Sequence, residues 1–106
     1  MKLLALNFWQ QQKKFFPMNG ISSVAVCSLN VNGIGSKQKR DRIKAHCETF
    51  NAQILVLIDT RLSESTAREL ENEWDNRLWY HSYAVQSGGG ISRGISIGIE
   101  KKTPSQ

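Results

Sequence analysis

Apolar residues alternate along the stretch from Ser22 to Asn32, and both faces of this stretch are mostly apolar. Val24, Val26, Ser28 and Asn30 fall on one face, and Ala25, Cys27, Leu29 and Val31 fall on the other. This pattern is typical of a strand in a sheet that is covered on both sides. It predicts a buried strand, and Gly33 and Gly35 predict the turn that ends it.

A helical repeat replaces the alternation after this turn. Ser36 is a suitable N-cap for a helix over residues 37–50. Four residues repeat at the spacing of one helix face: Ile43, His46, Cys47 and Phe50. The run from Ile54 to Ile58 is short and continuously apolar, which predicts a buried strand parallel to the first one.

The second half of the chain again places a helix before strands. Ser63 can cap a helix. The buried stripe of this helix is formed by Ala67, Leu70 and Trp74. Two further strands are predicted at residues 78–85 and 94–100, on either side of a glycine-rich loop. We expect these two strands to pair as an antiparallel hairpin.

Residues 1–20 differ from the rest of the chain. A glutamine and lysine run at the centre of this leader is followed by Pro17 and Gly20, which interrupt regular structure. We expect the leader to be disordered or a loosely attached helix, and residues 21–106 to form the domain. Deleting the leader is then expected to leave thermal unfolding nearly unchanged.

The composition is that of one small basic domain. The chain has 106 residues, of which 40% are hydrophobic, and its net charge of +5 weakly favours a polyanionic partner. Basic residues crowd the start of the first predicted helix, among them Lys37, Lys39 and Arg40. They could contact the phosphate backbone of a nucleic acid, and a solvated helix face is the alternative.

The cysteine pattern predicts neither a disulfide framework nor a zinc site. Cys27 lies in an apolar strand and Cys47 on an apolar helix stripe, so we expect two core thiols in a reducing compartment. No apolar run reaches the length of a membrane span, and no signal peptide is recognised. The sequence therefore predicts an intracellular protein, nuclear or cytoplasmic, without a membrane partner.

Polar residues follow both of the predicted parallel strands. Asn30 and Asn32 end the first strand, and Asp59 ends the second. Because parallel strands finish at the same edge of a sheet, we expect Asn30 and Asp59 to meet there and to face one cleft. From the residues alone, Asn30 is also explained as a turn former, and Asp59 as a cap or a partner of Arg61.

Four motifs occur in a characteristic order along the chain. They are Ser28-Leu29-Asn30-Val31-Asn32-Gly33, Lys39-Arg40, Asp59-Thr60-Arg61 and Arg93-Gly94-Ile95-Ser96-Ile97. In this order they resemble the endonuclease/exonuclease/phosphatase superfamily, and most closely the endonuclease domain of LINE-type (non-LTR) retrotransposon polyproteins. The resemblance implies an α/β (α+β) fold, namely the N-terminal half of a two-sheet α/β sandwich of the DNase I-like type.

The resemblance also implies a site and a chemistry. Asn30 matches an active-site asparagine of the family, and Asp59 matches its metal-binding carboxylate, which is usually a glutamate. The implied activity is Mg²⁺-dependent hydrolysis of phosphodiester bonds in DNA, with Asp59 as the metal ligand. Arg61 stands where the family has a histidine, and it could hold a phosphate or pair with Asp59. Arg93 could also contact phosphate, and a solvated loop arginine is the alternative. The implied partners are DNA and the rest of a polyprotein with a reverse transcriptase.

The chain departs from the family in its second half. The family's histidine base and further aspartates have no counterpart before Gln106. His46 is predicted to be a half-buried core residue instead, and His81 a surface or core-edge residue. We therefore expect a fragment that is inactive alone, binds Mg²⁺ weakly and exposes an apolar sheet face. The alternatives are a decayed retroelement fragment without activity, a small basic nucleic-acid-binding module, and a phosphomonoesterase of the same superfamily.

Overall fold

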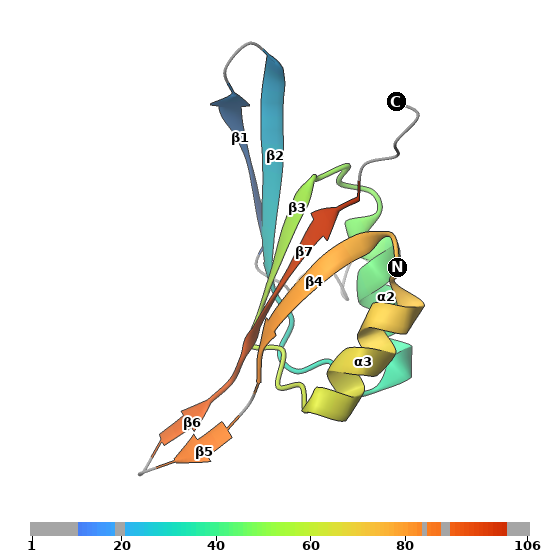
Figure 1. Ribbon diagram of the computed structural model, residues 1–106, viewed down its shortest axis with the longest axis vertical. Coiled ribbons are helices and arrows are strands. Elements are labelled where there is room, and N and C mark those ends of the chain that lie inside the picture. The colour runs from blue at the N-terminus through green and yellow to red at the C-terminus, as the bar shows by residue number, and fades with distance from the viewer. Residues whose placement is uncertain (1–10, 19–20, 84, 88–89, 102–106) are drawn as a thin grey trace, which may run out of the picture.

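A computed structural model describes residues 11–18, 21–83, 85–87 and 90–101, which form an α+β domain (Figure 1). In chain order, the elements are β1 (Gln11–Met18), β2 (Ile21–Asn30), α2 (Lys37–Cys47), β3 (Ile54–Ile58), α3 (Glu64–Glu73), β4 (Arg77–Ser82), β5 (Val85–Ser87), β6 (Gly90–Ser92) and β7 (Ile95–Glu100).

A mixed sheet of five strands organises the domain, in the order β1-β2-β3-β7-β4. β2 and β3 are parallel neighbours, with Val26 opposite Ile54 and Asn30 opposite Ile58, as the sequence predicted. β4 and β7 pair antiparallel, which confirms the predicted hairpin. The short strands β5 and β6 form a separate ribbon that extends this hairpin beyond the sheet (Figure 1).

Both helices cover the same face of the sheet (Figure 1). They begin at the predicted caps: the Ser36 side chain accepts a hydrogen bond from the Lys39 N–H, and Ser63 forms a capping box with Thr66. The core lies between the helices and this face. Its fully buried members include Leu29, Leu55 and Leu57 from the strands, Ile43 from α2 and Leu70 from α3.

The opposite face of the five-stranded sheet, called the open face below, has no element over it among the described residues (Figure 1). Large apolar side chains are exposed on it, and Leu78 and Tyr80 are 49% and 59% exposed. Ile58, Ile95 and Ile99 also stand on the open face. The expected exposed apolar face is therefore present. The strand Ser22–Asn32, predicted to be covered on both sides, is buried on its Ala25 side only.

The N-terminal segment differs from the expectation of a disordered or loosely helical leader. Residues 11–18 form β1, an edge strand antiparallel to β2, with Gln12 opposite Ser28 and Phe16 opposite Val24. An edge strand pairs with one neighbour only and tolerates proline. At Pro17, where the sequence predicted a break in regular structure, the pairing of β1 with β2 continues with a shift in register between Phe16 and Met18. Residues 1–10 and 19–20 of the predicted leader lie outside the described residues.

Both cysteines are buried, as predicted. Burial raises the pKa of the Cys47 thiol to about 12 and also raises the pKa of Cys27 above its ordinary value. In the described part of the chain, no helix combines the length and the apolar character that crossing a membrane requires.

Candidate functional site

The loops that follow β2 and β3 lie side by side at one edge of the sheet. The Val31 N–H donates to the Ile58 carbonyl at 2.9 Å, so the parallel pairing continues past the ends of the strands. This pairing brings Asn30 and Asp59 to the same edge, where open α/β sheets commonly place their sites.

A third segment holds the loop that contains Asp59. The N–H groups of Asp59 and Thr60 both donate to the Gly94 carbonyl, at 3.0 and 3.1 Å. The Arg61 N–H donates to the Arg93 carbonyl at 2.6 Å. The two arginines named as phosphate contacts are therefore neighbours in space, although they lie on separate loops.

Asp59 and Arg61 have left-handed backbone conformations, with φ of 65° and 54°. Such a conformation costs a non-glycine residue on the order of 1–3 kcal/mol and persists where the surroundings enforce it, often at functional sites. Here the hydrogen bonds to Gly94 and Arg93 enforce it. The left-handed conformation of Asp59 interrupts the alternation by which successive residues of a strand point to opposite faces of the sheet. Asp59 therefore lines the same pocket as its neighbour Ile58.

A pocket of about 410 Å³ lies at this edge. It is lined by Asn30, Ile58, Asp59, Ser82, Arg93, Gly94 and Ile95. Asn30 and Asp59 thus line one cavity at this edge of the sheet. Ser82 is a lining residue that the sequence did not indicate. It is placed there by the pairing of β4 with β7, in which it lies opposite Ile95.

Asn30 also has the local role that its residue type suggested. Its Oδ1 atom accepts a hydrogen bond from the Asn32 N–H at 3.2 Å, which is the side-chain turn typical of asparagine. Asn32 itself has a φ of 53° and is a turn residue. The turn occupies one of the two acceptor positions of Asn30 Oδ1, and the Nδ2 group of the same amide is a donor.

Asp59 is paired with arginine. Arg61 donates to both of its carboxylate oxygens, from Nε to Oδ1 at 2.8 Å and from Nη2 to Oδ2 at 3.0 Å, and Arg93 Nη1 lies 3.6 Å from Oδ2. The hydrogen bond from Arg61 holds the pKa of Asp59 below its ordinary value. Asp59 is therefore ionised at neutral pH, and its charge is balanced by the two guanidinium groups.

The residues at this edge do not fit a magnesium site. Mg²⁺ takes oxygen ligands in octahedral geometry, commonly from one or two carboxylates. Both oxygens of the single carboxylate here are engaged by Arg61, and two guanidinium groups stand where the cation would bind. The described residues contain no group of three or more potential metal ligands of the His, Cys, Asp and Glu types. Magnesium stays an expectation from the resemblance.

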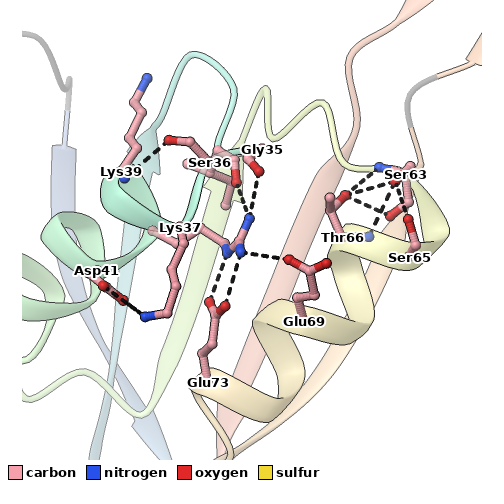
Figure 2. Close-up of polar contacts among 12 residues, drawn as sticks. Gly35, Ser36, Lys37, Lys39, Asp41, Ser63, Ser65, Thr66, Glu69 and Glu73 are labelled. Carbon is pink, nitrogen blue, oxygen red and sulfur yellow. Dashed lines mark hydrogen bonds and ion pairs between the residues drawn. The ribbon is translucent and has the colours of Figure 1, made fainter.

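The basic side chains at the start of α2 already have partners within the domain. Lys37 pairs with Asp41 at 3.0 Å on the helix surface (Figure 2). Lys39 donates to the Asn32 carbonyl at 3.0 Å, which places its ammonium group beside the Asn30 turn. Partial burial, together with nearby Arg42 and Arg61, lowers the pKa of Lys39.

Arg40 has a structural role, contrary to its inclusion among the residues expected to bind nucleic acid. Its side chain is 3% exposed and pairs with Glu73 at 2.8 Å and with Glu69 at 3.0 Å. The two glutamates reach from α3 toward the start of α2 (Figure 2). Arg40 Nη1 also donates to the carbonyls of Ile34 and Gly35. A phosphate cannot reach this guanidinium group unless the helices separate.

His81 lies between Ser96 and Glu71 and is hydrogen-bonded to both, which the sequence did not indicate. Its Nδ1 atom lies 2.7 Å from Ser96 Oγ, and its Nε2 atom lies 2.9 Å from a carboxylate oxygen of Glu71. Ser96 is fully buried, so this serine cannot meet a substrate. These hydrogen bonds connect α3 to the sheet. His46 is half-buried, as predicted, and the side chain of His81, predicted to be a surface or core-edge residue, is 3% exposed.

Comparison with known proteins gives no match: no family model, no curated protein and no solved structure is detectably similar to the chain.

Proposed function

We propose that the domain is the N-terminal half of a phosphodiester-hydrolysing domain of the endonuclease/exonuclease/phosphatase type, similar to the endonucleases of LINE-type retrotransposons. The observation that carries this proposal is the pocket shared by Asn30 and Asp59, at the edge where the parallel strands β2 and β3 end. The resemblance assigns both residues to the active site, and the order of the strands independently brings them to one edge.

The open face supports the idea of a half domain. A sheet with an apolar face is stable when a second layer packs on that face, at about 10 Å in sheet-on-sheet packing. Leu78, Tyr80 and Ile95 are the kind of side chains that such a layer would bury. In the proposed domain, the second half provides this layer together with the histidine base and the further carboxylates.

The residues present have defined roles in this proposal. The Asn30 amide donates to a phosphate oxygen, and the Arg93 guanidinium, whose side chain is 65% exposed, neutralises phosphate charge. Neither residue can activate a water molecule, because neither an asparagine amide nor a guanidinium is a base at neutral pH. The chain alone is therefore expected to bind a phosphodiester and not to cleave it.

Complementation between split halves tests the proposal. The chain is co-purified with the C-terminal half of a LINE-type endonuclease domain, and nicking of supercoiled plasmid is measured with Mg²⁺. We expect nicking by the mixture, none by either half, and loss of nicking in Asn30→Ala but not in the control Asn72→Ala, on the exposed surface of α3. If the halves associate but nicking is absent, or is unaffected by Asn30→Ala, the proposal is wrong.

A further inference from the structure

The two edges of the five-stranded sheet differ in how they are protected against pairing with a further strand. β1, at one edge, contains Lys13, Lys14 and Pro17, and its register with β2 is shifted near the proline. Lysine, proline and irregular register are common means by which an edge strand avoids pairing with another chain. β4, at the other edge, contains neither lysine nor proline, and its register with β7 is regular along its whole length. β4 is therefore the edge that can accept a further strand.

The hydrogen bonds of β7 show which backbone groups of β4 point outward. The Lys101 N–H, just after β7, donates to the Asn76 carbonyl at 3.1 Å, and the preceding N–H, that of Glu100, donates toward the β3 side at 2.8 Å. Because this direction alternates along an antiparallel pair, Leu78 and Tyr80 direct their backbone groups at β7. The residues whose backbone groups point away from β7 are Arg77, Trp79 and His81. Within residues 11–18, 21–83, 85–87 and 90–101, no strand lies beyond β4.

A pocket of about 340 Å³ lies beside this edge, between α3 and β4. Its lining includes Trp79 and charged residues of both signs: the acids Glu71 and Asp75, and the cations Arg77 and Lys101. A surface that carries both signs can be complementary to itself about a two-fold axis, because the acids of one copy then face the cations of the other. The charges beside β4 thus favour a second copy of the chain as the neighbour.

We infer that β4 pairs antiparallel with β4 of a second copy of this chain, about a two-fold axis at Trp79, so that the sheet continues across both copies. In this register, Trp79 lies opposite Trp79 of the second copy, and Arg77 lies opposite His81 of the second copy. The outward backbone groups of these residues then form about six hydrogen bonds between the copies. A two-fold contact of this kind closes at two copies.

The side chains of β4 fit the same register. On the open face, Leu78 of each copy lies opposite Tyr80 of the other, and an aliphatic residue beside an aromatic one is a favourable cross-strand pair. Like charges do not meet, because Arg77 faces His81, whose Nε2 atom lies 2.9 Å from a Glu71 carboxylate oxygen. The inference is independent of the proposed function, in which the second layer packs on the open face and not on the β4 edge.

Cysteine crosslinking tests this register. Residues directly opposite each other in an antiparallel pair have Cβ atoms about 4.5–5.5 Å apart, close to the distance that a disulfide spans. Chains with Leu78→Cys and chains with Tyr80→Cys are mixed and oxidised, and the linked peptides are identified by mass spectrometry. We expect the product that joins positions 78 and 80 to dominate. Either variant alone should give little product, because its two cysteines are only diagonally opposed. The native cysteines do not interfere, because both are buried.

The matched control is Ile99→Cys mixed with Tyr80→Cys. Ile99 stands on the open face opposite Leu78, but one strand inside the edge, so this mixture should give no more product than Gln38→Cys, exposed on α2, mixed with Tyr80→Cys. Sedimentation velocity of the parent chain should show one species of twice the chain mass. In that dimer, exchange of the Trp79 and His81 amide hydrogens should be slower than in the monomer at low concentration.

Equal linking through Ile99→Cys would show that the copies meet through their open faces, and would overturn the inference. A parent chain that stays monomeric at the concentrations used for crosslinking would overturn it as well, as would a dimer in which exchange at Trp79 and His81 is unchanged. The test involves no second half and no cleavage, so its outcome is separate from that of complementation.

Discussion

Gly98 lies directly against the Trp79 indole on the helix side of the sheet. A Cβ atom at this position would approach Trp79 Cη2 to 2.6 Å. The indole has little freedom to move, because its Nε1–H donates to the Trp74 carbonyl at 2.8 Å and its ring packs edge-on against the Trp74 ring. The missing side chain at Gly98 therefore makes room for a large aromatic residue on the neighbouring strand.

The variant Gly98→Ala should lower the free energy of unfolding by about 1–3 kcal/mol, the usual cost of overpacking a core. Urea unfolding followed by tryptophan fluorescence measures this change. Gly35→Ala is the control, because nothing lies within 4 Å of an added Cβ there, and its effect should stay within about 1 kcal/mol. Equal midpoints for the two variants would show that Trp79 repacks freely.

At the scale of elements, Arg40 joins the two helices to each other. Its guanidinium connects α2 to Glu69 and Glu73 of α3 and to the loop carbonyls that precede α2. Lys44 adds a hydrogen bond from α2 to the Glu73 carbonyl at 3.0 Å. Because no other ion pairs between α2 and α3 are found among the described residues, Arg40 is the main polar connection between the helices.

Arg40→Met should destabilise the domain by about 2–3 kcal/mol, because it leaves the partly buried Glu73 and two loop carbonyls without their hydrogen-bond partner. Arg68→Met, which breaks an exposed pair within α3, should cost about 0.5 kcal/mol or less. Chemical unfolding of both variants at neutral pH gives the comparison. A cost for Arg40→Met as small as that of Arg68→Met would contradict the structural role.

The strand β1 leads to a prediction opposite to the one made from sequence. β1 pairs with β2 from Gln11 to Met18, and the Lys13 ammonium donates to the Phe50 carbonyl beyond α2. Deleting residues 1–18 should therefore lower the thermal midpoint by several degrees, since each 1 kcal/mol corresponds to roughly 4–8 °C in a domain of this size. Deleting residues 1–10 alone keeps the strand and is the control. Equal midpoints for the full chain and the chain without residues 1–18 would contradict the pairing.

Local patterns were enough to predict much of the fold. The caps Ser36 and Ser63 depend on neighbouring residues alone. The parallel pairing of β2 with β3 and the β4–β7 hairpin join residues distant in sequence, and the order of apolar runs, helix and turn between them was enough to predict both. β1 was missed because a polar segment with a proline becomes a strand only when β2 offers it backbone partners. The residues of β1 alone do not indicate that β2 will lie beside them.

The position of the candidate site was predictable, and a pair between Asp59 and Arg61 was one of the alternatives that the residues left open. Strand order alone brings Asn30 and Asp59 to one edge. The left-handed backbone of Arg61 and the two-point pair with Asp59 depend on hydrogen bonds to residues 93 and 94, which are distant in sequence. The burial of Arg40 likewise depends on glutamates of α3 that are placed by tertiary packing, so a basic run on a helix could not distinguish it from Lys37 or Lys39.

At the scale of the molecule, α2 and α3 cover one face of the five-stranded sheet, and no element within residues 11–18, 21–83, 85–87 and 90–101 covers the other. Contiguous apolar surface of more than a few hundred Å² is uncommon on monomeric proteins and promotes association. On the open face, Ile99 lies opposite Leu78 across the β4–β7 pair, and the half-buried Ile97 lies opposite Tyr80, so apolar side chains form continuous rows rather than scattered points. Burying them would stabilise an assembly by roughly 25 cal/mol per Å² of apolar surface, before the cost of association is subtracted.

The isolated chain should therefore associate as its concentration rises, and it should bind a hydrophobic dye such as ANS. The double variant Leu78→Lys, Tyr80→Lys places two charges in the middle of the open face and should shift the chain to a monomer with weak dye binding. The control Gln38→Lys, Asn72→Lys adds the same charge at exposed positions of the helices and should behave like the parent chain. Sedimentation velocity over a range of concentrations separates the cases. A parent chain that stays monomeric without binding dye would show that the face is not available, and equal loss of association in both variants would assign the effect to net charge rather than to the open face.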